Sequence, residues 1–323
     1  MTVRIAVLDD YQGVALRHGR WADLPGDTEV TPLREHVPDP GRLVELLRGH
    51  QVVVAMRERT PLPRAVLEQL PELRLLVTTG MQNASIDMAA AAGLGITVCG
   101  TQSDSSGPAE LTWALVLALA RHVVPEDAAT RAGRWQQTVG TGLRGRTLGL
   151  VGLGRIGGLV GQVGVAFGMR VLAWSQHLTA ERAAEVGAEV VTKERLLAES
   201  DVVSLHLRLS DRSRGIVGAA ELAAMKPTAV LVNTSRGPLV DEAALVRALH
   251  DGTIAGAGLD VYDDEPVRPG AAVLSAPNTV LTPHLGYVTD STYDVFYGQA
   301  VEDVAGFLAG APVRVLAAPE RPR

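Results

Sequence analysis

The stretch TLGLVGLGRIG, residues 147–157, constrains the fold more than any other part of this 323-residue chain. It joins an apolar run to a helical pattern at Ile156–Phe167, and its glycines Gly152, Gly154 and Gly157 have the G-x-G-x-x-G spacing of a dinucleotide-binding turn. The first glycine of such a turn makes the tight bend, the second lets the backbone approach a pyrophosphate, and the third lets helix and strand pack closely. The helix N-terminus offers N–H groups and a positive dipole end to the phosphates. This strand–turn–helix context predicts a dinucleotide site rather than a glycine-rich loop without a ligand.

Short apolar runs alternate with helical patterns before and after this turn, which predicts parallel sheets flanked by helices. The first series has strand candidates at Val3–Leu8, Gln51–Ala55, Arg74–Thr78 and Ile96–Val98. The second series has six, at Thr147–Val151, Arg170–Trp174, Val202–Leu205, Ala229–Asn233, Gly256–Asp260 and Thr279–Leu281. A further helix at Ser291–Leu308 and an extended piece at Pro312–Leu316 follow, so we expect the C-terminal helix to return to the first unit. The predicted fold is therefore α/β, with two Rossmann-like domains and doubly wound parallel sheets. A dinucleotide-binding domain of residues 102–286 is inserted into a substrate domain of residues 1–101 and 287–323.

One helix candidate, Ala109–His122, is apolar on nearly all faces, and Ser106, Pro108 and Glu110 predict a capped start. Such a helix is expected to be buried in a domain seam or a subunit interface. The net charge of −6 without a basic run argues against nucleic acid as a partner. The single Cys99 suits a reducing compartment, and neither a signal peptide nor a membrane-spanning run is visible. We therefore expect a cytoplasmic protein.

Three polar residues follow late strands, at the edge where doubly wound sheets place their chemistry. Arg236 lies in NTSRGPLVDE, Glu265 in GLDVYDDEP and His284 in TPHLG. Reduction of a 2-keto acid needs a forked cation for the carboxylate, a proton donor that titrates near neutral pH, and an anion that orients this donor and favours its protonated form. Each residue alone would be read as an ordinary surface or packing residue, but the three together, downstream of a dinucleotide turn, predict an active site. No metal site is predicted, because the histidines have no close paired spacing.

The second strand of the dinucleotide series ends at Ser175, where an Asp or Glu normally accepts the adenosine ribose hydroxyls. A serine does not repel a 2′-phosphate, and His177, Arg182 and Arg208 could receive one, although each alone also fits an exposed surface residue. The missing acid favours NADP over NAD, or the use of both. Asp260 ends a later strand and either meets the nicotinamide amide or caps a turn.

These motifs, together with AELTWALVLALAR and NTVLTPHLG, resemble the NAD(P)-dependent D-2-hydroxyacid dehydrogenases over almost the whole chain. The resemblance implies an oxidoreductase that reduces a 2-keto acid to an (R)-2-hydroxy acid by hydride transfer from NAD(P)H, with His284 as proton donor. It also implies a homodimer joined through the cofactor domains. Further cofactor contacts are implied at Thr112, Arg155, Ile156, Ser175, His206, Thr234, Asp260 and Gly286. A substrate-carboxylate loop is implied at TGMQN, with Gly80, Met81, Gln82 and Asn83, and a pocket segment at AMRERT, where Arg57 either reads an acidic substrate or lies on the surface.

The chain departs from the family pattern at three positions. Ser175 replaces the ribose acid and Arg208 the usual proline, which bears on the choice between NAD and NADP; Gln82 replaces a common glycine, which bears on the substrate. Two alternative functions stay open. A phosphite-type dehydrogenase would keep the Arg, Glu and His, whereas a formate enzyme of this kind carries Gln in place of Glu265. A dinucleotide-sensing, corepressor-like binding protein would keep the glycine turn without turnover.

Overall fold

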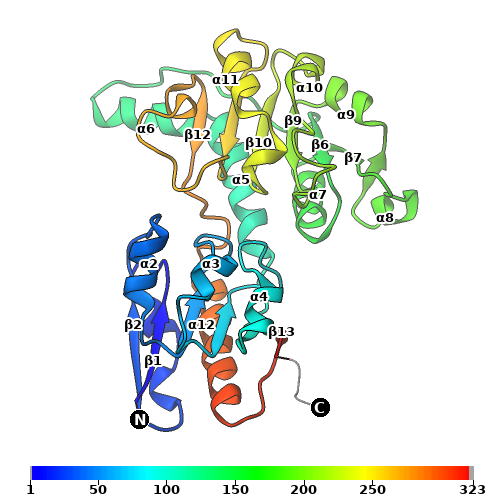
Figure 1. The fold of residues 1–323 in the computed structure, drawn as a ribbon. Helices are drawn as coiled ribbons and strands as arrows, with labels where there is room; N and C mark the ends of the chain where they lie inside the picture. Colours follow the sequence, from blue (N-terminus) through cyan, green and yellow to red (C-terminus); the bar gives the residue numbers. More distant parts are fainter. Residues whose placement is uncertain (1, 320–323) are drawn as a thin grey trace. The chain divides into compact units, whose positions relative to one another are not determined.

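The computed structural model describes residues 2–319 and divides the chain into two compact units. The first unit comprises Met1–Asp104 and Thr289–Arg323, and the second comprises Ser105–Val288. The first unit therefore carries both the blue N-terminal and the red C-terminal parts of the ribbon in Figure 1. The first junction, after Asp104, lies three residues later than the expected boundary after residue 101, and the second, after Val288, lies two residues later than the one after residue 286.

The first unit is built on a six-stranded sheet in the order β13-β5-β4-β3-β1-β2. The strands are β1 (Val3–Val7), β2 (Thr28–Pro32), β3 (Val52–Ala55), β4 (Leu75–Thr78), β5 (Thr97–Gly100) and β13 (Val315–Ala317). All pairs are parallel except β13, which runs antiparallel to β5. The strand β2 was not predicted, because its sequence TEVTP ends in proline and has little apolar character. It lies at the sheet edge, where a proline is tolerated.

Helices cover both faces of this first sheet. They are α1 (Ala15–His18), α2 (Pro40–Leu47), α3 (Arg64–Leu67), α4 (Met88–Gly93) and α12 (Asp290–Leu308), with a 3₁₀ turn at Trp21–Asp23. Buried side chains of α2, α3 and α4 form one core with alternate residues of the strands. On the other face α12 packs against β4 and β5, so the C-terminal helix does return to the N-terminal unit.

The second unit has a seven-stranded parallel sheet in the order β12-β11-β10-β9-β6-β7-β8. Its strands are β6 (Thr147–Val151), β7 (Arg170–Trp174), β8 (Ala188–Val190), β9 (Val202–Leu205), β10 (Val230–Asn233), β11 (Gly256–Leu259) and β12 (Thr279–Leu281). The strand β8 was missed, because it is a short edge strand with the exposed Glu189 at its centre. The order reverses between β6 and β9, which is the switch point where doubly wound sheets bind ligands.

Helices also cover both faces of the second sheet. They are α5 (Ser106–Ala120), α6 (Val123–Arg131), α7 (Arg155–Ala166), α8 (Ala180–Ala184), α9 (Lys193–Glu199), α10 (Ala219–Ala224) and α11 (Glu242–His250). Helices α5 and α7 share one apolar core, and α9, α10 and α11 share the core on the opposite face.

The predicted cap of the apolar helix α5 was wrong. Its N-cap is Ser105, whose side chain makes no capping hydrogen bond, so the predicted cap is absent. Within one chain its burial is one-sided, because Trp113 and Val116 are buried whereas Glu110 and Ala114 are exposed, so burial against a second subunit stays a prediction. The sequence concealed this asymmetry because alanine and leucine stand on both sides of the helix.

Candidate active site

The glycine turn has the geometry that a dinucleotide pyrophosphate requires. Gly152 has a φ of 103° and donates its N–H to the carbonyl of Trp174 at 2.8 Å, which ties the turn to the end of β7. Gly154 caps the N-terminus of α7, and a Cβ placed on it would meet no protein atom within 4 Å. A Cβ on Gly157 would lie 2.3 Å from the Gly152 carbonyl oxygen, so helix and turn are in backbone contact. These positions leave the N-terminus of α7, which begins with Arg155 and Ile156, open to a phosphate.

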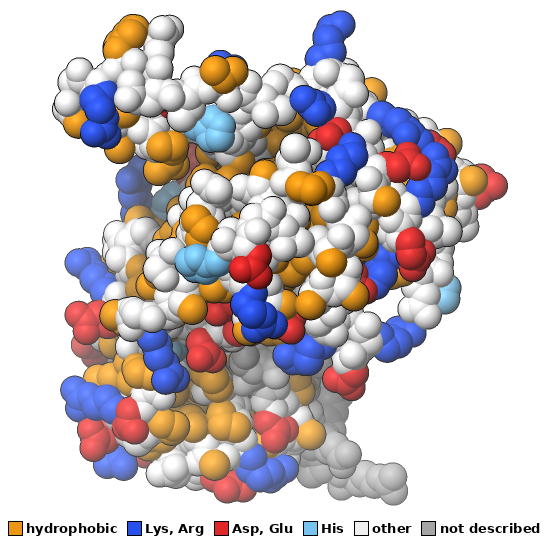
Figure 2. Space-filling view, turned by 90° about the horizontal axis from the view of Figure 1, so that it is seen from above, with side chains coloured by type: hydrophobic (Ala, Val, Ile, Leu, Met, Phe, Trp, Pro, Cys, Tyr) orange, Lys and Arg blue, Asp and Glu red, His pale blue; other side chains and the backbone are white. Residues whose placement is uncertain are grey.

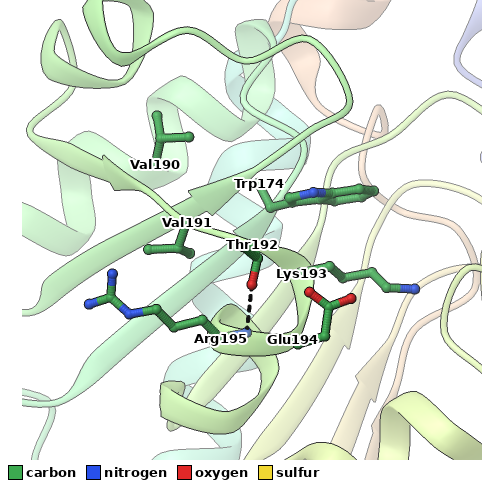
Figure 3. Close-up of a pocket in the computed structure, with 7 residues that line it drawn as sticks. All are labelled: Trp174, Val190, Val191, Thr192, Lys193, Glu194 and Arg195. Atoms are coloured by element: carbon green, nitrogen blue, oxygen red, sulfur yellow. Dashed lines mark hydrogen bonds between the residues drawn. The ribbon is translucent and has the colours of Figure 1, made fainter.

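Beyond the turn, Ser175 lies half-buried directly after β7. A depression of about 610 Å³ at the carboxyl ends of β7 and β8 is lined by Trp174, the residue before Ser175, and by the segment 190–195 (Figure 3). Of the three cations expected nearby, Arg182 pairs with Glu185 and lies against α7 at Gly158. The other two, His177 and Arg208, are exposed.

His206 follows β9 on the other side of the switch point, in surroundings that disfavour its charged form. Its Nε2 lies 2.9 Å from the Ser204 hydroxyl, and burial lowers its pKa to about 4. Its Nδ1 is buried and has no hydrogen-bond partner within the described residues. A Cβ on Gly152 would lie 2.5 Å from the His206 carbonyl oxygen, so this histidine adjoins the glycine turn. Because buried polar atoms are nearly always paired, the orphaned nitrogen fits a position that a ligand or water completes.

Arg236 is positioned by the residue that ends β10. The buried Asn233 donates to the Arg236 carbonyl at 2.9 Å and accepts from the Ser235 N–H at 3.1 Å, which closes the loop in one conformation. The guanidinium itself donates to the Ser235 carbonyl at 2.7 Å. Next to it, a Cβ on Gly237 would lie 2.0 Å from the carbonyl carbon of Tyr262, so only glycine lets this loop contact the loop after β11.

Glu265 and His284 form a directly hydrogen-bonded pair. Glu265 Oε2 lies 2.6 Å from His284 Nδ1, and the two side chains are only 21% and 17% exposed. The other carboxylate oxygen accepts the Tyr262 N–H at 3.0 Å, which fixes the acid from its own loop. His284 has a φ of 56°, and its ring meets the edge of Tyr287 with centroids 5.6 Å apart. A left-handed non-glycine residue is costly and concentrates at functional sites.

Asp260 holds the loop that carries His284. One of its oxygens accepts the Thr282 hydroxyl and the Leu285 N–H, both at 2.6 Å, and the other accepts the Gly286 N–H at 2.9 Å. Burial raises the pKa of this carboxyl, while these hydrogen bonds favour its ionised form. Two roles were expected for Asp260, contact with the nicotinamide amide and capping of a turn, and these hydrogen bonds correspond to the second.

Two further residues expected to touch the cofactor lie together in the same unit. The hydroxyls of Thr112, from α5, and Thr234, after β10, are 2.8 Å apart. Sequence reasoning did not identify Asn233, Tyr262 or Thr282, although each lies inside a motif that it quoted.

The expected substrate residues lie together in the first unit, at the carboxyl ends of β3 and β4. Arg57 donates its backbone N–H to the Thr79 hydroxyl at 2.9 Å, and its carbonyl accepts from Asn83 at 2.6 Å. Gly80 has a φ of 108°, and a Cβ on it would lie 2.3 Å from the Arg57 guanidinium. The exposed Met81 and Gln82 complete the loop. The structure thus joins the loop and the pocket segment by hydrogen bonds.

The described residues contain no cluster of three or more His, Cys, Asp or Glu side chains able to hold a metal ion. Likewise, no helix within residues 2–319 combines the length and the apolar character needed to cross a membrane.

Comparison with known proteins shows which family the sequence of the second unit matches. Residues 113–286 match the family described as "D-isomer specific 2-hydroxyacid dehydrogenase, NAD binding domain". A glyoxylate reductase of Aeropyrum pernix is 42% identical over 255 residues, 76% of each chain. A glycerate dehydrogenase of Methylorubrum extorquens is 35% identical over 290 residues, 86% of this chain and 89% of its own length. The crystal structure of a putative D-3-phosphoglycerate dehydrogenase from Ralstonia solanacearum superposes with a TM-score of 0.92 at 38% identity, covering 97% of this chain and 96% of that one.

Proposed function

The chain belongs to the D-isomer specific 2-hydroxyacid dehydrogenases, and from that premise we propose that Arg236, Glu265 and His284 carry out its reduction of a 2-keto acid to an (R)-2-hydroxy acid. The chain is an oxidoreductase with an NAD-binding domain. The observation that carries the assignment of residues is the 2.6 Å contact between Glu265 Oε2 and His284 Nδ1. It joins an acid and a base from two strand ends within one unit.

The roles of the three side chains follow from this contact. When bound, the reduced dinucleotide supplies the hydride that adds to C2 of the keto acid. Glu265 accepts a hydrogen bond from the Nδ1–H group of His284. The proton to be transferred is therefore held at Nε2 and passes to the carbonyl oxygen of the keto acid. The carboxylate also stabilises the imidazolium before transfer. The Arg236 guanidinium binds the substrate carboxylate through parallel N–H groups, which a lysine could not reproduce.

The test is His284→Gln, with a panel of glyoxylate, hydroxypyruvate, pyruvate and phenylpyruvate. We expect the variant to bind dinucleotide as the wild type does, while kcat falls by about two to four orders of magnitude through loss of general acid catalysis. His250→Gln is the matched control, because His250 is exposed at the end of α11. Near-normal reduction by His284→Gln would remove this residue from the mechanism.

We further propose that the physiological substrate is a small 2-keto acid. The names of the relatives, glyoxylate reductase and glycerate dehydrogenase, support this size class. The same assay with phosphite and oxidised dinucleotide addresses the alternative. Reduction of dinucleotide by phosphite, together with inactivity toward every keto acid, would replace the proposal.

For the cofactor we propose that NADPH serves at least as well as NADH. Ser175 supplies no carboxylate to repel a 2′-phosphate, and the exposed His177 and Arg208 support binding of one. The ratio of kcat/KM for the two cofactors, with one keto acid held fixed, measures the preference.

We also propose a cytoplasmic homodimer joined through the second unit. Apolar side chains are exposed along α7 and at its end: Leu159 is 36%, Val163 39% and the C-cap residue Phe167 40% exposed. In the segment after α6, Trp135 is 76% exposed. Figure 2 shows Lys and Arg side chains interleaved with Asp and Glu on the face drawn, without a continuous basic area suited to nucleic acid. Sedimentation of the wild type and of Val163→Lys measures the association: a monomeric wild type contradicts the proposal.

A further inference from the structure

The motif VLDD at the end of β1 remains outside the proposed chemistry, although its first acid is unusually placed. Asp9 is 3% exposed and has a φ of 56°. Asp10, the next residue, is 1% exposed but has an evident local role, because it accepts the N–H groups of Val14 and Ala15 and so caps the start of α1. No such local role explains Asp9, because all of its side-chain partners are side chains from loops.

The carboxylate of Asp9 joins three loops at the carboxyl edge of the first sheet. One oxygen lies 3.2 Å from the Tyr11 hydroxyl, within its own loop, and 3.1 Å from Nδ1 of His36, in the loop after β2. The other accepts the hydroxyl of Thr60, in the loop after β3, at 2.7 Å. Thr60 is itself 3% exposed, so this last bond is buried at both ends and is the shortest of the three.

The loop after β3 is the pocket segment that also contains Arg57. Arg57 has a φ of 52°, so the neighbouring strands β1 and β3 each lead into a left-handed non-glycine residue. Backbone strain of this kind persists only where surrounding contacts impose it. For the pocket segment, Thr79 and Asn83 hold the Arg57 end, and Asp9 holds the Thr60 end. The strand order also reverses between β1 and β3, the place where open α/β sheets bind ligands.

We propose that Asp9 is a positioning residue for substrate binding: through Thr60 it fixes the conformation of the pocket segment, residues 55–60. This inference rests on the proposed keto-acid reduction, because it gives that segment its role. The side-chain partners of Asp9, which are Tyr11, His36 and Thr60, all lie in the first unit, whereas the trio belongs to the second. Loss of Asp9 therefore weakens binding of the keto acid without slowing the chemical step.

The test removes the hydrogen bond between Thr60 and Asp9 by substituting Thr60. Thr60→Val keeps the shape of the side chain but cannot donate to Asp9, whereas Thr60→Ser restores the hydroxyl. We expect Thr60→Val to raise KM for the keto acid about tenfold, as loss of one hydrogen bond to a charged group allows, with kcat within about twofold and unchanged dinucleotide affinity. Thr60→Ser should return KM to near the wild-type value. Asp9→Asn tolerates the left-handed backbone and keeps a neutral acceptor for the Thr60 hydroxyl, so it should raise KM by less than Thr60→Val does.

Asp10→Asn is the matched control, because it alters the adjacent buried acid without touching the pocket segment. It should leave KM within about twofold of the wild type and change the melting temperature little, since asparagine accepts the same backbone N–H groups and caps a helix about as well as aspartate. An unchanged KM in Thr60→Val, or an equal rise in KM in Asp10→Asn, overturns the role of Asp9. Failure of the proposed function is a separate result: a wild type that reduces none of the keto acids overturns that function and, with it, the role of the segment.

Discussion

The glycines at the start of α7 allow the cofactor site to be tested with three single substitutions. Each of Gly154→Ala, Gly157→Ala and Gly158→Ala adds one methyl group at or next to the same helix turn. The surroundings of that methyl differ: no protein atom lies within 4 Å at Gly154, a backbone carbonyl oxygen lies at 2.3 Å at Gly157, and the flexible end of Arg182 lies at 3.4 Å at Gly158. The three variants therefore separate ligand space, backbone packing and helix propensity.

The expected magnitudes follow from these distances. At Gly157 the Gly152 carbonyl must retreat by about 0.7 Å to reach 3.0 Å, the shortest distance that a real Cβ tolerates. Overpacking of this kind costs about 1–3 kcal/mol, which offsets the roughly 1 kcal/mol that alanine gains over glycine inside a helix. The displaced turn also loses a phosphate contact, worth about 1.5–3 kcal/mol, so dinucleotide binding should weaken roughly tenfold to a hundredfold. Gly154→Ala should weaken binding by a similar factor and lower the melting temperature slightly, because alanine is a poorer N-cap than glycine. Gly158→Ala should bind normally and melt slightly higher.

Two measurements are needed. Isothermal titration calorimetry measures the affinity of each variant for NADH and for NADPH, and thermal melting without ligand measures its stability. Normal affinity in Gly154→Ala would show that the pyrophosphate does not approach the N-terminus of α7, and the cofactor site would have to lie elsewhere. Equal behaviour of Gly157→Ala and Gly158→Ala would show that the contact between turn and helix does not constrain the site.

Three further predictions concern catalysis, titration and cofactor choice. Glu265→Gln should lower kcat for keto-acid reduction and leave dinucleotide affinity unchanged, because the imidazole of His284 loses its anionic hydrogen-bond partner; an unchanged kcat would contradict the pairing. His206 has a folded pKa of about 4 against an ordinary 6.5, so the unfolded chain binds more protons between these values and stability falls as pH drops from 6.5 to 4. His206→Gln should lack this pH-dependent part of the free energy of unfolding, which amounts to at most about 3 kcal/mol. Denaturant unfolding of the wild type and the variant at a series of pH values measures it, and an equal dependence on pH in both proteins would contradict a neutral buried imidazole. Ser175→Asp should shift the NADPH/NADH ratio of kcat/KM toward NADH by about tenfold to a hundredfold, mainly through KM for the cofactor; a strong NADH preference already in the wild type would show that the missing acid was misleading.

The sequence predicted the dinucleotide unit well because local patterns dominate there. Four strands, at 147–151, 170–174, 202–205 and 279–281, have the predicted bounds, since apolar residues dominate each of them. The strands it missed, β2 and β8, are edge strands interrupted by Glu29 and Glu189, whereas the edge strand β12 keeps the apolar pair Val280 and Leu281 and was predicted. Which side of α5 is buried within one chain could not be predicted, because alanine and leucine leave no contrast between the two sides of the helix.

The candidate site shows a different division between what sequence and structure supply. The trio was predicted because each residue follows a strand, and parallel strands bring their carboxyl ends to one edge. The roles of the two acids could not be separated in this way, because Asp260 and Glu265 both follow β11 within one motif. Their partners separate them: Asp260 uses both oxygens on the 282–286 turn, whereas Glu265 gives one oxygen to its own loop and the other to the imidazole. The buried acid therefore fixes where His284 lies, and the partly exposed acid fixes where its proton lies. Since these are independent requirements, neither carboxylate can replace the other.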